Sequence, residues 1–221
     1  MSRTPAIARL VLASILAVLA AAPASAGPPI YGFKGGLGVA TLHGELPTDP
    51  FGAHEARKGF GGGASLMFGL GGALALQPEV LFVTKGTSLG KVNVSDWNGN
   101  VVGQSEVIQA CNYVEIPMLL RVATPTAGAL APFLVAGPAI GILTSQKIVQ
   151  QGMDGGLVPL EVAKGTDFGV AMGFGAELGN GSARGTIESR YTYGLTPATN
   201  ASYSDARNGS LLVMAGVTIH P

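Results

Sequence analysis

Eight segments of the sequence alternate large apolar residues with glycine, alanine or polar residues, and this period of two is the strongest constraint on the fold. Such alternation is typical of β-strands with one apolar face, because successive side chains point to opposite sides of a sheet. After residue 26, no run of apolar residues has the three- and four-residue spacing of an amphipathic helix. The segments are residues 30–42, 59–70, 72–85, 113–124, 130–143, 167–178, 183–193 and 210–219.

The connections between these segments are alternately long and short. Short, turn-like links lie at residues 70–72, 125–128 and 179–182, whereas residues 86–112 and 144–166 form long polar links. Short periplasmic turns that alternate with long outer loops are typical of bacterial up-and-down barrels. Each segment is also long enough for a tilted membrane strand, which needs about 9 to 11 residues.

The two faces of the predicted strands differ in chemistry. One face carries large uncharged residues such as Phe33, Leu37 and Phe174, and the other carries small residues and nearly all of the strand charges. Small residues crowd the charged face as they would in a narrow lumen, so we expect the apolar face to meet lipid. The sequence therefore predicts an all-β fold, an eight-stranded antiparallel up-and-down transmembrane β-barrel over residues 27–221. An exported lipocalin-like binder, with the apolar face inward around an apolar ligand, is the alternative.

The composition agrees with a surface that does not face water everywhere. Charged residues make up 12% of the chain, about half of the roughly 25% that is usual for soluble domains. The mean hydropathy is +0.39. The formal net charge is zero, so we expect no nucleic-acid partner.

Residues 1–26 have the pattern of a secretory signal peptide. A basic start with Arg3 and Arg9 precedes an apolar run over residues 10–22 and an Ala-Ser-Ala cleavage site that ends at Ala26. The run is shorter than the ~20 apolar residues that span a bilayer as a helix, which argues against a retained anchor. We expect cleavage after Ala26 and localisation in the cell outer membrane.

Five stretches in order along the chain carry a resemblance to a known family. They are residues 31–42, 76–86, 113–121, 132–141 and 188–195. Together they resemble the PorT-like outer-membrane β-barrel family, a group of compact OmpA-type barrels. The resemblance implies an eight-stranded barrel in the outer membrane of a Gram-negative bacterium, and it brings no catalytic residues with it.

A set of charged residues lies on the small face and is predicted to form a charge network in the lumen. Glu79 and Glu115 are expected on adjacent strands, with Arg190 as the cation between carboxylates and Glu188 beside it. Glu177 and Arg184 flank one tight turn and are expected to pair. The complete set is Lys34, Glu79, Glu115, Arg121, Glu177, Arg184, Glu188 and Arg190. We interpret it as an ion-paired plug, since buried ions persist only when paired; a narrow pore is the alternative.

No catalytic, cofactor-binding or metal site is predicted. The only cysteine, Cys111, is interpreted as an incidental loop residue, and His43, His54 and His220 as scattered, solvated histidines. A lipid-directed hydrolase that uses His43 and His54 with a loop residue is the enzymatic alternative, although no local motif joins them.

Partners are expected from the membrane and from the outer side. Outer-membrane lipid should surround the barrel, and protein partners should meet the outer loops, while the barrel itself is expected to be a monomer. The loops are residues 43–58, 86–112, 144–166 and 195–209.

Four prolines lie inside predicted strands, where proline removes a donor from the hydrogen-bond ladder. They are Pro78, Pro117, Pro132 and Pro138. A closed barrel has no edge strand, so we expect β-bulges or strand ends at these positions.

Overall fold

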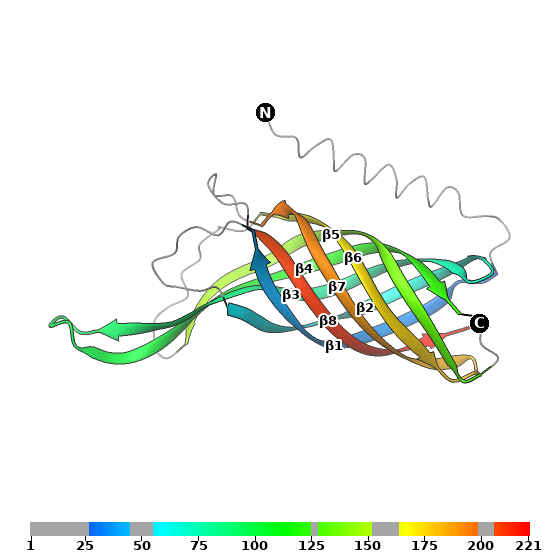
Figure 1. The fold of residues 1–221 in the computed structure, drawn as a ribbon, viewed down its shortest axis with the longest axis horizontal. Coiled ribbons are helices and arrows are strands. Elements are labelled where there is room, and N and C mark those ends of the chain that lie inside the picture. Colours follow the sequence, from blue (N-terminus) through cyan, green and yellow to red (C-terminus); the bar gives the residue numbers. More distant parts are fainter. Residues whose placement is uncertain (1–26, 45–54, 125–127, 152–163, 199–205) are drawn as a thin grey trace, which may run out of the picture.

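Eight strands form one closed barrel, in which every strand is antiparallel to its neighbours in the sequence and β1 pairs with β8 (Figure 1). The computed structural model describes residues 27–44, 55–124, 128–151, 164–198 and 206–221. The strands are β1 (Ile30–His43), β2 (Glu55–Gly71), β3 (Leu74–Ser95), β4 (Val101–Ala123), β5 (Leu130–Gln151), β6 (Thr166–Leu178), β7 (Ala183–Pro197) and β8 (Arg207–Ile219). The predicted fold class is therefore confirmed. The predicted signal peptide, residues 1–26, lies outside the described residues and stays a prediction.

Tight turns close one end of the barrel. Gly71 and Gly72 join β2 to β3 with positive φ angles of 108° and 58°, a region that residues with a Cβ rarely adopt. Gly179 does the same after β6, with a φ of 107°. Tyr31 pairs with Ile219, so the start of β1 and the end of β8 meet at this end of the barrel (Figure 1).

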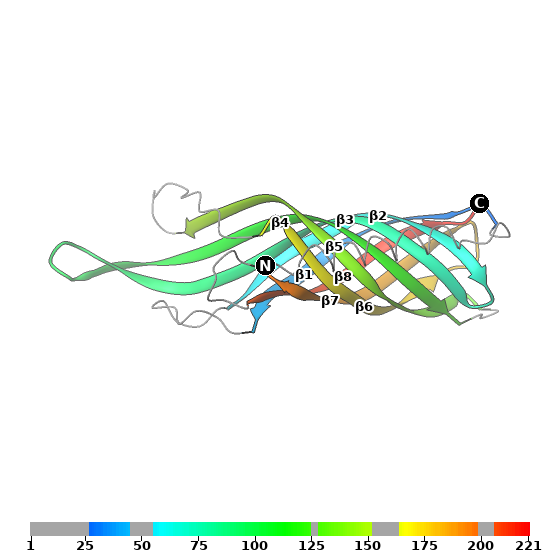
Figure 2. The ribbon, with the colours of Figure 1, turned by 90° about the horizontal axis from the view of Figure 1, so that it is seen from above.

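At the opposite end, three strands continue far beyond the barrel (Figures 1 and 2). Pairing of β3 with β4 runs out to Ser95 and Val101, whereas the pairing of β2 with β3 stops at Ser88. The expectation that residues 86–112 form a polar loop is wrong, because most of this segment forms a hairpin. The first part of the predicted loop 144–166 also belongs to β5, which ends at Gln151. The pairing of β3 with β4 continues from the barrel wall into residues 86–112, although this segment lacks a clear alternation of apolar and polar residues.

The prediction of bulges or strand ends is wrong for Pro78, Pro117 and Pro138. The register of β3 with β4 is the same on both sides of Pro78 and Pro117, and β5 keeps its register with β6 past Pro138. Instead, two consecutive ladder pairs are missing beside each of these prolines on the side of the preceding strand, so each missing donor is tolerated locally. Pro132 is the third residue of β5 and pairs with Ala176 without a register shift.

Large apolar side chains cover the outside of the barrel. Leu37 is 76% exposed, Phe174 63% and Phe33 58%, although all three belong to central parts of strands. Every strand contributes to this apolar surface, which also includes Val39, Phe60, Leu66, Leu74, Val80, Phe82, Leu120, Leu134, Ile142, Met172, Ile187, Leu211, Val213 and Val217. The apolar face therefore points outward, and the lipocalin-like alternative, which needs it inward, is wrong. Within the described residues there is no helix of the length and apolarity that crossing a membrane requires.

Candidate functional site

The interior holds the charged residues in three groups that follow one another along the barrel. Alternation places them there, since the neighbours of each charged residue in its strand point outward. Arg190 and Glu115 are each 1% exposed and Glu79 is 2% exposed. Such burial in a protein interior is tolerated only when each charge has a close partner of opposite sign.

The central group joins β1, β3 and β7. Lys34 Nζ lies 2.7 Å from Glu79 Oε1 and 2.8 Å from Glu188 Oε2. Arg190 Nη1 donates to Glu79 Oε2 at 2.7 Å, and Arg190 Nε donates to Glu188 Oε1 at 2.7 Å, next to a second contact of the guanidinium with that oxygen. Two cations and two carboxylates thus balance. Arg190 was predicted as the cation for Glu79 and Glu115; in the structure it contacts Glu79 and the neighbouring Glu188 instead.

The second group lies toward the tight turns. Arg121 Nη2 donates to Glu177 Oε1 at 2.8 Å, and Arg184 Nη1 lies 3.5 Å from Glu177 Oε2. The Arg121 guanidinium also lies over the ring of Phe133, 3.5 Å from the centroid. Gln77 connects this group with the central one, because it accepts a hydrogen bond from Arg121 at 3.3 Å and donates to Glu79 at 2.6 Å.

The third group lies toward the outer end, and of its charged residues only Glu115 belongs to the network that was predicted from the sequence. Lys85 Nζ lies 2.9 Å from Glu115 Oε2 and 3.0 Å from Asp167 Oδ2. Thr192 donates to Glu115 at 3.2 Å, and Asn208 donates to Asp167 at 3.0 Å. Glu115 therefore does not share Arg190 with Glu79, and its cation is Lys85. Lys85 and Asp167 both occupy inward positions of the alternation, which is the signal that could have added them to the predicted network.

Apolar side chains fill the lumen between the charged groups. Leu81 and Val83 of β3 pack against Leu212 and Met214 of β8, although β1 and β2 separate these strands in the wall. They approach across the lumen because β1 and β2 present glycines inward: a Cβ at Gly61 would lie 3.1 Å from the Leu212 side chain. A second apolar group comprises Leu119, Phe133, Val135, Ala139 and Ala171.

One small cavity lies between the central group and the group near the turns. It measures about 10 Å³, and Lys34, Arg121 and Thr186 are among its lining residues. A single water molecule needs roughly 10–15 Å³ of such space. The described lumen at this level is thus occupied by side chains, with space for about one water.

The residues considered for other chemistry occupy different surroundings from those expected. Cys111 is not in a loop but is buried on the inner face of β4. His43 is not solvated, because it ends β1 and stacks on Tyr193 with a ring-centroid distance of 4.3 Å. His220 Nε2 lies 3.5 Å from Glu177 Oε2, and His54 lies outside the described residues. In the part of the chain that the structure describes, no three His, Cys, Asp or Glu side chains are grouped as a metal site would need.

Comparison with solved structures finds similar folds at low sequence identity. Neisserial surface protein A has the same fold with a TM-score of 0.51 and 14% identity, and the match covers 88% of this chain and 100% of that one. Ail of Yersinia pestis is similar with a TM-score of 0.44 and 11% identity, over 87% of this chain and 100% of Ail. OprG of Pseudomonas aeruginosa gives a TM-score of 0.45 and 11% identity, over 87% and 96% of the two chains.

The sequence comparisons agree with the barrel architecture. No curated protein matches the sequence. The sequence profile of one protein family matches residues 30–200, which include seven complete strands of the barrel and are more than half of the chain. The family is one of outer-membrane proteins, in agreement with the apolar outer surface of the strands. The chain belongs to the family described as outer membrane protein beta-barrel domain.

Proposed function

We propose that this protein is a closed, non-enzymatic outer-membrane barrel that presents a projecting hairpin at the cell surface. The observation that carries the proposal is the filling of the lumen by paired charges and apolar side chains. Eight strands enclose a lumen just wide enough for side chains, so a filled interior leaves no continuous water path. A surface role then rests on the part of the chain outside the membrane.

We expect the purified protein to give no steady channels in planar bilayers at neutral pH. Ions would have to displace Lys34, Glu79 and Arg190 from contacts that satisfy all of their charge. The measurement is single-channel current with protein whose folding is first verified by different gel migration with and without boiling. Steady open channels would contradict the proposal and favour the narrow pore.

The projecting hairpin presents apolar side chains at a well-ordered tip. Trp97 is fully exposed, and Val101 and Val102 are 60% and 64% exposed. Asp96 Oδ1 accepts hydrogen bonds from the backbone N–H groups of Asn98, at 2.8 Å, and of Asn100, at 2.9 Å. The hydrogen bonds from Asn100, foremost the one from its backbone, hold the pKa of the Asp96 carboxyl below its ordinary value. An exposed aromatic residue on a fixed turn is suited to contact with a partner.

This proposal requires the hairpin to lie on the outer side of the membrane. In a Cys111→Ser background, a cysteine introduced by Asn98→Cys should react with a membrane-impermeant maleimide on intact cells. The matched control Asn180→Cys, in the exposed turn between β6 and β7, should react only after the outer membrane is permeabilised. Labelling in the reverse order would place the hairpin in the periplasm and contradict the proposed role.

We infer further features that accompany this role. Membership of the PorT-like group is supported by the five matching stretches from residue 31 to residue 195. Residues 1–26 are proposed as a cleaved export signal, and the working form as a monomer. Protein partners are proposed to bind through the outer segments, foremost the hairpin formed by residues 86–112.

A further inference from the structure

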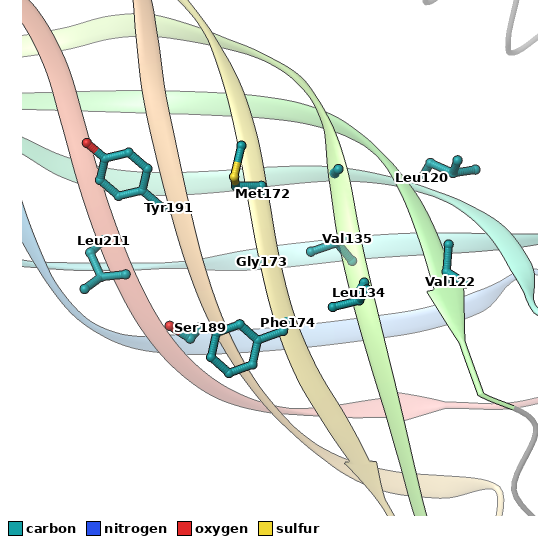
Figure 3. A pocket seen from close by; sticks show the side chains of 11 residues that line it. Leu120, Val122, Leu134, Val135, Met172, Gly173, Phe174, Ser189, Tyr191 and Leu211 are labelled. Atoms are coloured by element: carbon teal, nitrogen blue, oxygen red, sulfur yellow. The ribbon is translucent and has the colours of Figure 1, made fainter.

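A groove of about 620 Å³ crosses the outside of the barrel from β4 to β8 (Figure 3). Small residues, Ala136, Gly173 and Ser189, lie along it, and Met172 and Phe174 are among the larger residues that border it. No charged side chain lines it. The groove belongs to the apolar surface that meets lipid, so its surroundings supply hydrocarbon.

The groove has the length and inclination of a lipid acyl chain. It crosses five neighbouring strands, which are about 4.8 Å apart, and therefore extends over about 19 Å. Strands of such barrels tilt by about 35–45°, so a groove across them is also inclined to the membrane normal and rises by a distance comparable to one leaflet. One leaflet contributes about half of the roughly 30 Å hydrocarbon core. The lower end lies at Val122, one residue before the end of β4, and the upper end at Leu211, four residues after the start of β8.

The upper end of the groove is polar. The Tyr191 side chain lies over Gly209: a Cβ at that glycine would be 2.7 Å from Tyr191 Oη and 3.1 Å from His43 Nδ1. Tyr193, stacked on His43, is the cross-strand neighbour of Gly209. Arg207 is the next outward residue above Gly209 on β8 and pairs with His43 in the ladder.

These polar groups have unused donors. Both ring nitrogens of His43 are buried, and neither has a hydrogen-bond partner among the described residues. Arg207 likewise makes no salt bridge within the described part of the chain. Buried polar atoms are almost always paired, so this cluster points to an absent acceptor. An anionic acceptor with several oxygens, such as a phosphate group, suits an Arg next to a His and a Tyr hydroxyl.

We propose that the groove and this cluster together bind one molecule of lipopolysaccharide. An acyl chain would occupy the groove, and a phosphate group would lie at Arg207 and His43. The two ends of the groove differ in polarity, and this difference assigns the bound lipid to the outer leaflet. The cation and the hydroxyl lie at the outer end, whereas the lower end, at Val122 and Leu134, is apolar. A phospholipid of the inner leaflet would need its headgroup at that apolar end. The inference requires only an outer-membrane barrel and is independent of whether the lumen conducts.

The test is native mass spectrometry of the full-length protein purified in mild detergent and supplied with lipopolysaccharide or phosphatidylglycerol. The wild type should retain one lipopolysaccharide molecule in preference to phosphatidylglycerol. Arg207→Glu should reduce retention about tenfold or more, because it replaces attraction by repulsion of the phosphate. Ala136→Phe should reduce it similarly by filling the groove. The matched controls are Lys58→Glu, an exposed outward cation on β2, and Ala64→Phe, an exposed outward alanine on the same strand.

The two variants and the two controls separate this site from general contact with lipid. All variants are first checked for folding by their gel migration with and without boiling, which keeps loss of binding apart from loss of structure. Equal retention by Arg207→Glu and Lys58→Glu, or by Ala136→Phe and Ala64→Phe, would overturn the proposal. Preferential retention of phosphatidylglycerol would also overturn it, since the bound lipid would then be of another class.

Discussion

Replacing Arg190 with alanine is expected to lower the free energy of unfolding by about 3–5 kcal/mol, because its removal leaves one cation for two buried carboxylates. Arg190 contacts both Glu79 and Glu188, and Lys34 alone would then face two negative charges. The measurement is urea titration of the protein in lipid vesicles, with the folded fraction taken from gel migration without boiling.

Two further variants make this result specific. Arg184→Ala removes a partly exposed partner at 3.5 Å from Glu177 and should cost about 1 kcal/mol or less. Adding Glu79→Gln to Arg190→Ala restores the balance of charge and should recover part of the lost stability. If Arg190→Ala costs no more than Arg184→Ala, the interior is hydrated, and the ion pairs are not what keeps it closed.

Valine at position 36 is expected to prevent closure of the barrel between β1 and β8. A Cβ at Gly36 would collide with the carbonyl oxygen of Val213, and a Cβ at Gly216 would collide with that of Phe33 on the other side of the same seam. Backbone atoms cannot move aside as side chains do, so Gly36→Val should lower the free energy of unfolding by about 3 kcal/mol or more. The measurement is the fraction of refolded protein that shows the faster migration of a closed barrel.

The neighbouring glycine is a matched control for the same substitution. A Cβ at Gly35 would have its nearest contact at 3.8 Å, and this residue faces outward. Gly35→Val should therefore refold like the wild type. Similar yields for Gly35→Val and Gly36→Val would show that the two strands separate more easily than their close approach indicates.

The strands of the barrel wall could be predicted because lipid and lumen impose different chemistry on alternate residues. Beyond the membrane that difference disappears, so the continuation of β3 and β4 through residues 86–112 carried no comparable pattern. The error over the prolines has a different cause. A bulge is one response to a missing donor, but Pro78 and Pro117 show that a barrel can instead lose two consecutive ladder pairs at a proline and keep its register.

The sequence could predict which charged residues face the interior, but not which of them form ion pairs with one another. The alternation of residues along a strand assigns each side chain to the inner or the outer face of the barrel. Its position along the barrel axis depends instead on the register between strands and on the shear of the whole barrel. Glu115 lies opposite Leu81 in the ladder, two residues above Glu79, and this offset brings it to Lys85. The apolar pair Leu81 and Leu212 escaped prediction for the same reason, since no sequence pattern shows that glycines lie between them.

The central charges come from parts of the chain that are far apart in synthesis. Lys34 is 45 residues from Glu79 and 154 from Glu188, and Arg190 is 111 residues from Glu79. A barrel that lacks its last strands would therefore leave Lys34 and Glu79 with only each other as partners, and Glu79 without the guanidinium of Arg190. The second cation and the second carboxylate arrive only with the seventh strand, so complete pairing of the central group is missing from every shorter insertion intermediate.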